Sequence, residues 1–278
     1  MTPLSLGTAG KVLRHGILTA TTLFALLPFI WMLSLSVKPA TEIFRADFRL
    51  LPGSLAGMNN YAVVFSQAPM VRFLLNGALV CGTIFVLQML VCVPCAYALA
   101  KLRFRGKDTL FSAVLIALLI PPQALSIPHF LLLYYAGLLD SYGALILPWI
   151  FSAFGVFLLR QFFRTVPDEL IHAARLDGMS ELEIIWRVMV PMSAPAIVAF
   201  GIFSVLSHWN DLFWPLIALH RIELSTPALG IMLFRDDEAG QQFGPLMAAT
   251  TIIVTPLILA FLCAQRRFID GLAIHMTN

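Results

Sequence analysis

Charged residues are scarce in this sequence. Only 12% of its 278 residues are Asp, Glu, Lys or Arg, and 59% are hydrophobic, whereas a soluble domain carries about 25% charged residues. Apolar runs of about 20 residues recur along the chain, and each is long enough to cross a hydrocarbon layer about 30 Å thick. These proportions exclude an ordinary soluble domain. They predict an all-α polytopic membrane protein.

Cysteine and catalytic motifs are also sparse. Cys92-Val93-Pro94-Cys95 has the spacing of a redox pair, but it lies inside an apolar run rather than beside a βαβ pattern. We therefore expect the four cysteines to be small buried thiols. No spacing of Cys and His resembles a metal site. Gly7-Thr8-Ala9-Gly10-Lys11 lacks the length and the following Ser or Thr of a phosphate loop, so neither enzymatic activity nor a bound cofactor is expected.

Six apolar segments predict six transmembrane helices, with both termini on one side of the membrane. Twelve of the 18 basic residues then share the side of the termini, which the positive-inside rule assigns to the cytoplasm. These residues lie in short loops beside the spans rather than in one patch, so a nucleic-acid partner is not implied. The spans are expected at about 12–37, 73–100, 109–128, 142–160, 195–219 and 244–265.

A polar segment at 165–191, between the fourth and fifth spans, has the signals of a capped helical hairpin. Thr165 and Asp168 fit a capping pair, with Pro167 in the first turn. Gly178 is suited to end the first helix, because glycine tolerates the left-handed conformation found there. Ser180 and Glu183 form a second capping pair, which begins a helix expected to run to about Met189.

Such a hairpin is too short to be a domain and too polar to lie in lipid. Ala173 and Ala174 keep its first helix slim, so the backbone can approach another surface closely. We therefore expect it to dock onto a soluble partner. The alternative is an amphipathic stretch that rests at the membrane interface.

At these residues the chain resembles a known family. Ala173-Ala174-Arg175-Leu176-Asp177-Gly178, with Val190-Pro191 downstream, is similar to the EAA loop of ABC importer permeases. More narrowly, the chain resembles the shorter six-span subunit of the maltose-type carbohydrate permeases. Further similar segments follow in order along nearly the whole chain: Ser36-Val37-Lys38-Pro39, Phe104-Arg105-Gly106-Lys107, Trp209-Asn210-Asp211 and Gln265-Arg266-Arg267-Phe268.

The resemblance implies a single importer transmembrane domain over residues 1–278, in the bacterial cytoplasmic membrane, with both termini in the cytoplasm. It implies four kinds of partner: the lipid bilayer, a second homologous permease subunit, two ATPase subunits that hold ATP and Mg, and an external solute-binding protein. In that family the hairpin is the coupling element, which is gripped by a cleft of the ATPase.

The coupling positions that the resemblance implies are Glu169, His172, Ala173, Ala174, Asp177 and Gly178. His172 stands where the family usually has glutamate, which puts a salt bridge to the ATPase from this position in doubt. Glu169, one turn earlier on the same helix face, is a candidate substitute.

Asn210 and Asp211, near the outer part of the fifth span, are candidates for the translocation path or the external gate. An ionisable group within a span usually faces a polar cavity or a partner. The alternative is a hydrogen bond that only holds the helices together, which is what we expect of Gln88 and Gln123.

The resemblance implies a carbohydrate as the solute. It leaves glycerol-phosphate-type solutes as the alternative, although phosphate recognition favours Arg or Lys and none lies deep in a span. An ion-coupled secondary carrier is a further alternative, which would need its own ion site. The resemblance also implies that the external loop 220–244, with the acidic run Asp236-Asp237-Glu238, reaches toward the binding protein.

Overall fold

The computed structural model describes residues 8–45, 49–235 and 243–276, and every regular element in these ranges is a helix. The acidic run 236–238 and the side chains of residues 265–268 lie outside the described residues. Within the described ranges, three helices are long and apolar enough to cross a membrane: Gly10–Ser36, Met70–Lys101 and Phe243–Cys263. The number of spans rises to six if each of three bent helix pairs forms one span.

The chain forms two compact units, residues 1–68 with 231–254 and residues 69–230 with 255–278. The first contains α1 (Thr8–Ser36), α2 (Ala40–Ile43), η1 (Leu55–Met58), α3 (Asn59–Gln67), η6 (Ile231–Phe234) and the beginning of α15 (Phe243–Met276). The second contains α4 (Met70–Lys101), α5 (Lys107–Ala117), η2 (Pro122–Leu125), α6 (Ser126–Tyr135), α7 (Tyr142–Ile146), η3 (Leu147–Trp149), α8 (Ala153–Thr165), α9 (Asp168–Leu176), α10 (Glu181–Glu183), η4 (Ile184–Met189), α11 (Val190–Met192), α12 (Ala194–Trp209), α13 (Phe213–Ala218), η5 (Ile222–Leu224) and α14 (Pro227–Gly230).

In the first unit, the turn that follows α1 is held by polar contacts around Lys38. This side chain is only 3% exposed. Its Nζ donates to the carbonyl of Arg49 at 2.5 Å and lies 4.9 Å from the ring centroid of Trp31. The amide of Asn60 donates to the carbonyls of Ser36 and Lys38, both at 3.0 Å. Burying an unpaired charge is costly, so these contacts are what allow Lys38 to lie inside.

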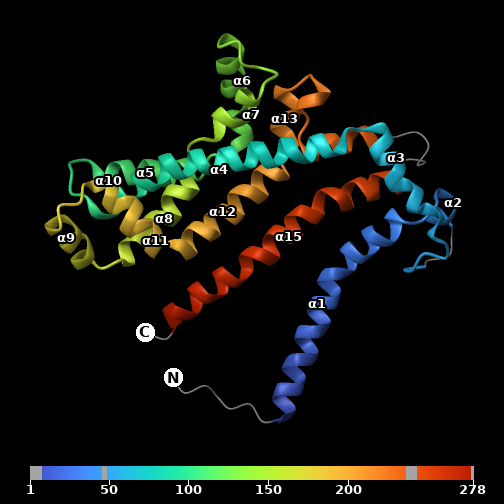
Figure 1. The fold of residues 1–278 in the computed structure, drawn as a ribbon, viewed down its shortest axis with the longest axis horizontal. Coiled ribbons are helices and arrows are strands. Elements are labelled where there is room, and N and C mark those ends of the chain that lie inside the picture. Colours follow the sequence, from blue (N-terminus) through green and yellow to red (C-terminus); the bar gives the residue numbers. More distant parts are fainter. Residues whose placement is uncertain (1–7, 46–48, 236–242, 277–278) are drawn as a thin grey trace. The chain divides into compact units, whose positions relative to one another are not determined.

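In the second unit, α8 and α12 pack along α4, as Figure 1 shows. One apolar cluster joins these three helices with α9 and η4, and its buried members include Tyr97, Leu159, Phe163 and Phe200. Gly155 permits the close contact of α8 with α12, because a Cβ at this position would lie 2.5 Å from the ring of Phe200.

A second apolar cluster joins α4 to α6, α7 and α13. Polar side chains cross-link this region. Gln88 donates to the carbonyl of Trp149 at 2.8 Å and accepts from the hydroxyl of Ser204 at 2.6 Å, which confirms its expected role between helices. Gln123 does not do this; it is exposed and lines a cavity.

Two of the six predicted spans contain a sharp bend. The segments Lys107–Ala117 and Pro122–Tyr135 meet at 98°, and Tyr142–Trp149 and Ala153–Thr165 meet at 43°. A third bend, of 84° between Glu181–Met192 and Ala194–Trp209, lies just before the predicted span 195–219. Pro121 lies in the first of these breaks and Pro122 follows it, and proline disfavours the helical conformation in the residue before it.

The predicted span 195–219 is also interrupted. α12 ends at Trp209 and α13 begins at Phe213. The 16 residues of α12 rise about 24 Å, which is less than the thickness of a hydrocarbon core. The apolar composition of the segment predicted its length but not its break.

The prediction of four buried thiols is wrong for two of them. Cys81 and Cys92 are buried, whereas Cys95 and Cys263 are exposed on the surface of the protein. Apolar composition alone does not separate a side chain in the core from one on an apolar outer surface, because both environments accept a small apolar group.

Candidate coupling hairpin and membrane cavity

The first helix of the hairpin, α9, does not begin as the sequence predicted. Pro167 is its N-cap residue rather than part of its first turn, and no side chain caps it. The hydroxyl of Thr165 instead donates backward to the carbonyl of Phe162 at 2.8 Å. Thr165 is therefore not a cap.

An ion pair from the end of α4 fixes the start of α9. Nζ of Lys101 lies 2.5 Å from Oδ1 of Asp168 and also donates to the carbonyl of Val166 at 2.5 Å. The hydrogen bond and the charge of Lys101 lower the pKa of the Asp168 carboxyl. A span helix thus takes the place of the local cap that the sequence suggested.

The turn between the two helices follows the prediction. Gly178 has a φ of +80°, and the N–H of Met179 donates to the carbonyl of Ala174 at 3.0 Å, a bond typical of helices that end in a left-handed glycine. Ser180 and Glu183 form a reciprocal capping box. The second helix ends at Met192, three residues beyond the predicted end at about Met189, after the π-helical turn η4 and α11.

A three-residue network connects the hairpin to span helix α4. Arg175 of α9 binds Glu181 of α10 through two nitrogens, at 2.7 Å and 3.2 Å. The hydroxyl of Tyr97 donates to the same carboxylate at 2.6 Å. The hydrogen bond from Arg175 is the main reason that the pKa of Glu181 lies below its usual value. Tyr97 itself is 1% exposed, so the network reaches from the core to the surface.

α9 has one buried and one exposed face. Ile171 and Ala174 are buried in the cluster that α9 shares with α4 and α8. Because successive residues are about 100° apart on a helix, the opposite face carries Glu169, Ala173 and Leu176. Ala174 therefore packs inside its own subunit, and Ala173 is the alanine of this pair that lies on the exposed face.

The exposed face of the hairpin includes large apolar side chains. Leu176, at the end of α9, is 89% exposed and Leu182 of α10 is 64% exposed. The remaining predicted coupling residues, Glu169, His172, Ala173, Asp177 and Gly178, are exposed as well. Apolar side chains beside charged ones are typical of a surface that binds another protein.

Beside His172 lies a polar hollow of about 350 Å³, lined by Lys101, Arg103, Asp168, Ile171, His172 and Arg175. Three permanent cations surround one carboxylate, and that carboxylate already binds Lys101. The surroundings of His172 are therefore basic.

The residues predicted for the membrane path lie at the break between α12 and α13. Asn210 is exposed, and its amide donates to the carbonyl of Leu206 at 2.9 Å. Asp211 is half-buried, and its Oδ1 accepts the backbone N–H of Trp214 at 3.2 Å. Asp211 lines a cavity of about 260 Å³, whereas Asn210 does not.

Aromatic residues that the sequence did not single out form the wall of this cavity. Trp149 lies at the centre, with its ring centroid 5.9 Å from that of His129, 5.6 Å from that of His208 and 6.5 Å from that of Trp214. These residues come from α6, η3, α12 and α13. No spacing along the chain connects them, so no motif in the sequence indicates this group.

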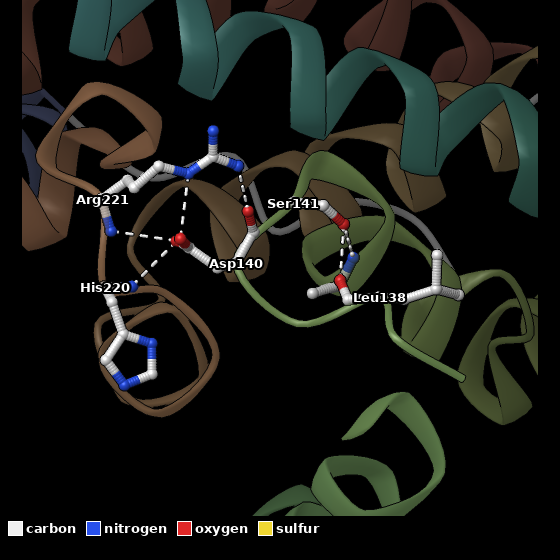
Figure 2. Close-up of polar contacts among 6 residues, drawn as sticks. Leu138, Asp140, Ser141, His220 and Arg221 are labelled. Carbon is white, nitrogen blue, oxygen red and sulfur yellow. Dashed lines mark hydrogen bonds and ion pairs between the residues drawn. The ribbon is translucent and has the colours of Figure 1, made fainter. Parts of the chain in front are cut away.

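A polar clamp joins the loop before α7 to the loop after α13, and Figure 2 shows it. The carboxylate of Asp140 accepts the backbone N–H groups of His220 at 3.0 Å and Arg221 at 2.9 Å, and also Nε of Arg221 at 2.9 Å. The two backbone bonds are the largest reason that the pKa of Asp140 is lowered. Asp140 adopts a φ of +57°, which an Asp tolerates better than most residues.

These features define a helical membrane protein with an exposed hairpin that is bonded to α4 and a cavity lined by aromatic and polar residues among bent helices. Residues 92–273 match the family described as "Binding-protein-dependent transport system inner membrane component". This match covers more than half of the chain, so the chain belongs to this family.

The chain is 32% identical to the arabinooligosaccharides transport system permease protein AraQ of Halalkalibacterium halodurans, over 90% of each chain. It is 31% identical to the sn-glycerol-3-phosphate transport system permease protein UgpE of Escherichia coli O1:K1, over 83% of this chain and 84% of that one. A crystal structure of a bacterial ABC transporter involved in the import of the acidic polysaccharide alginate contains a chain with the same fold, with a TM-score of 0.81 and 23% identity, over 96% of this chain and 100% of that one.

The chain is therefore a permease subunit of an ATP-driven ABC importer, multi-pass in the membrane, and is not itself an enzyme. Membership of a binding-protein-dependent family also implies an external binding protein and ATPase partners. The ion-coupled carrier considered above is thereby set aside.

Proposed function

We propose that this chain is one half of the translocation path of a carbohydrate importer, paired with a second, homologous permease. Two ATPase subunits, which hold ATP and Mg, bind this pair from the cytoplasm, and a solute-binding protein delivers the solute from outside. The chain then has six spans, the third and fourth each formed by a bent helix pair and the fifth by α12 and α13, with one transmembrane domain over residues 1–278 and both termini in the cytoplasm. The hairpin 165–191 then lies between spans four and five on the cytoplasmic side.

The exposed face of α9 supports the coupling role most directly. Leu176 is 89% exposed, although the cytoplasmic end of a permease has no lipid to cover it. Glu169, His172 and Ala173 lie on the same side of the helix, and Asp177 and Gly178 follow it. We assign this surface to the cleft of an ATPase subunit, with Leu176 as its apolar centre.

The rigidity of the hairpin fits a part that transmits force. The Lys101 pair fixes its start, the Ser180–Glu183 capping box fixes its second helix, and Glu181 connects it to Tyr97. A cap contributes about 1 kcal/mol. When ATP closes the ATPase pair, movement of its clefts would shift the hairpin and, through Lys101 and Tyr97, the end of α4.

Exchange of Leu176 tests the proposal. In the importer reconstituted with its ATPase and binding protein, Leu176→Asp should abolish stimulation of ATP hydrolysis by the binding protein. Leu176→Met, the matched control, preserves the apolar surface and should retain stimulation. Because the side chain contacts little of its own subunit, both variants should fold and insert normally. Full stimulation in Leu176→Asp would remove α9 from the ATPase interface.

For the solute, both relatives quoted above support compounds that carry several hydroxyl groups. One is named for arabinooligosaccharides and the other for sn-glycerol-3-phosphate. We propose that the importer transports a carbohydrate, and a glycerol-phosphate-type compound is the second candidate for its solute. The cavity beside Asp211 bears on this choice.

A further inference from the structure

The cavity beside Asp211 has the composition of a small-molecule site. Its volume is about 260 Å³, below the range of about 300–1,000 Å³ that holds a drug-sized ligand, so it suits a single ring-sized unit. Gln123, His129, Trp149, His208, Asp211 and Trp214 are among its lining residues. If the six-span arrangement holds, all six lie in the outer halves of the third, fourth and fifth spans, on the side from which solute arrives.

The wall combines apolar ring surface with hydrogen-bonding atoms at its edge. Trp149 and Trp214 meet at 86°, and His208 meets Trp149 at 65°. Rings in this edge-to-face arrangement hold one another in place. Nε1 of Trp214 donates to the carbonyl of Ala144 at 2.9 Å, which fixes that ring further. The C–H face of a sugar ring packs on aromatic surface of this kind, while its hydroxyl groups need polar partners.

Polar partners are present. Nδ1 of His129 is buried and has no hydrogen-bond partner among the described residues, which is costly unless a ligand or water provides one. Nδ1 of His208 binds the carbonyl of Ser204 at 2.7 Å, so that nitrogen carries the proton and Nε2 is left as an acceptor. The Asp211 carboxylate uses one lone pair for Trp214 and has capacity for further donors.

The charge of the wall selects between solutes. Among the described residues that line the cavity, Asp211 is the single acid, and Lys and Arg are absent. A carboxylate and neutral imidazoles accept hydrogen bonds from hydroxyl groups. They offer no counter-charge to a phosphate or a uronate, both of which are recognised best by Arg or Lys. A second anion near Asp211 would instead be repelled.

We propose that this cavity is a subsite for one unit of a neutral carbohydrate, and that it disfavours phosphorylated and acidic solutes. Trp149 and Trp214 provide the apolar wall, and His129, His208 and Asp211 receive the hydroxyl groups. The inference rests on the proposed importer function and narrows its substrate class. The negative charge of Asp211 in the cavity wall is the feature that distinguishes this chain from a glycerol-phosphate importer.

A transport assay with defined probes tests the substrate class. The complete importer, reconstituted in liposomes with its binding protein, is given neutral di- and trisaccharides, sn-glycerol-3-phosphate and an oligouronate in separate reactions. ATP-dependent uptake of one or more neutral saccharides is expected, with no uptake of either anion. Uptake of an anion would overturn the subsite while leaving the importer function intact. Failure of every probe would count against the proposed function itself.

Two variants then test the residues, with the neutral saccharide that is transported as the probe. His129→Phe removes the unpartnered nitrogen and keeps a flat ring, and Asp211→Asn keeps an acceptor for Trp214 and removes the charge. Each should raise the saccharide concentration for half-maximal uptake by about tenfold or more, because a hydrogen bond to the solute is lost. His15→Phe, at an exposed histidine of α1, is the matched control.

ATP hydrolysis without solute provides the second readout for these variants. The control His15→Phe should keep the wild-type level of this hydrolysis and of uptake, because His15 does not line the cavity. If the saccharide concentration for half-maximal uptake were unchanged in both variants, the proposal that the cavity is a solute subsite would be rejected. Loss of basal hydrolysis or of assembly with the partner subunits would show that the residues are structural, and this too would reject it.

Discussion

Asp140 and Arg221 hold each other through both backbone and side chain. Nε of Arg221 binds the Asp140 carboxylate at 2.9 Å, its Nη2 donates to the Asp140 carbonyl, and its N–H donates to the carboxylate (Figure 2). The N–H of Asp140 in turn donates to the carbonyl of Ala218 at 2.9 Å. The clamp therefore fixes the end of α13 against the start of α7, and Trp214 of the cavity wall lies within this fixed region.

We expect Asp140→Ala and Arg221→Ala each to lower the melting temperature of the purified importer and to raise the solute concentration for half-maximal uptake. The double variant should lose less than the sum of the two single losses, because both changes remove the bond between Nε of Arg221 and the Asp140 carboxylate. Arg72→Ala, at an exposed arginine, is the control. Additive losses in the double variant would show that the two residues act separately.

The clamp should also survive mild acid. The pKa of Asp140 is lowered in the folded protein, chiefly by hydrogen bonds from the backbone of Arg221 and His220. A carboxyl with a lowered folded pKa adds stability that is fully present above its unfolded value of about 3.9 and is lost as the pH falls through the folded value. Wild-type protein and Asp140→Ala should thus show the same difference in melting temperature at pH 7 and pH 5. A difference that disappears by pH 5 would contradict this.

At the hairpin turn, Gly178→Val should uncouple transport. Gly178 has a φ of +80°, and a β-branched residue held there costs about 1–3 kcal/mol. Space is not the obstacle, since a Cβ at this position meets no atom within 4 Å. His172→Ala, on the exposed face of α9 six residues earlier, should be tolerated better. Solute-dependent ATP hydrolysis at matched expression measures both, and normal coupling in Gly178→Val would refute this view of the turn.

Tyr97→Phe should weaken the connection between α4 and the hairpin. The change removes only the hydroxyl that donates to Glu181 at 2.6 Å, and the ring stays in the core. We expect a loss of about 1 kcal/mol in stability and a lower ratio of stimulated to basal ATP hydrolysis. Tyr135→Phe, at an 82% exposed tyrosine, is the control. If stability fell but the ratio of stimulated to basal ATP hydrolysis did not change, the network would stabilise the fold without taking part in coupling.

Local signals in the sequence predicted the hairpin turn well. The glycine turn and the Ser180–Glu183 box need only neighbouring residues, so short-range patterns specify them. Thr165 failed as a cap because it still belongs to α8, where its hydroxyl donates to the carbonyl of Phe162. The side chain of Asp168 is instead bound by Lys101, 67 residues earlier in the chain. The inward position of Ala174 likewise depends on a core built from other helices.

The cavity could not be predicted from the sequence. Trp149 and His208 lie in two different predicted spans and His129 just after a third, and their proximity depends on the bends at Pro121-Pro122 and before Ala153. Hydropathy reports that a segment is apolar and long but not where it bends. Asp211 was identified because a carboxylate in a span is conspicuous by itself, whereas its aromatic neighbours resemble ordinary membrane residues.

The two adjacent alanines of the hairpin allow a discriminating test of coupling. Ala173 is exposed, and Ala174 is 6% exposed and packs in the core. Ala173→Trp should leave the subunit folded but obstruct the ATPase cleft, whereas Ala174→Trp overpacks the core and should cost about 1–3 kcal/mol. The purified chain alone is expected to hydrolyse no ATP, since it lacks a phosphate loop.

In the complete importer, Ala173→Trp should therefore keep the melting temperature of the wild type and lose stimulation of hydrolysis by loaded binding protein. Ala174→Trp should lower the melting temperature or the yield. Hydrolysis with and without loaded binding protein, measured beside thermal unfolding, separates the two effects. If Ala173→Trp retained full stimulation, the cleft would have to bind another face of the hairpin, and the assignment of Leu176 to the interface would fall with it.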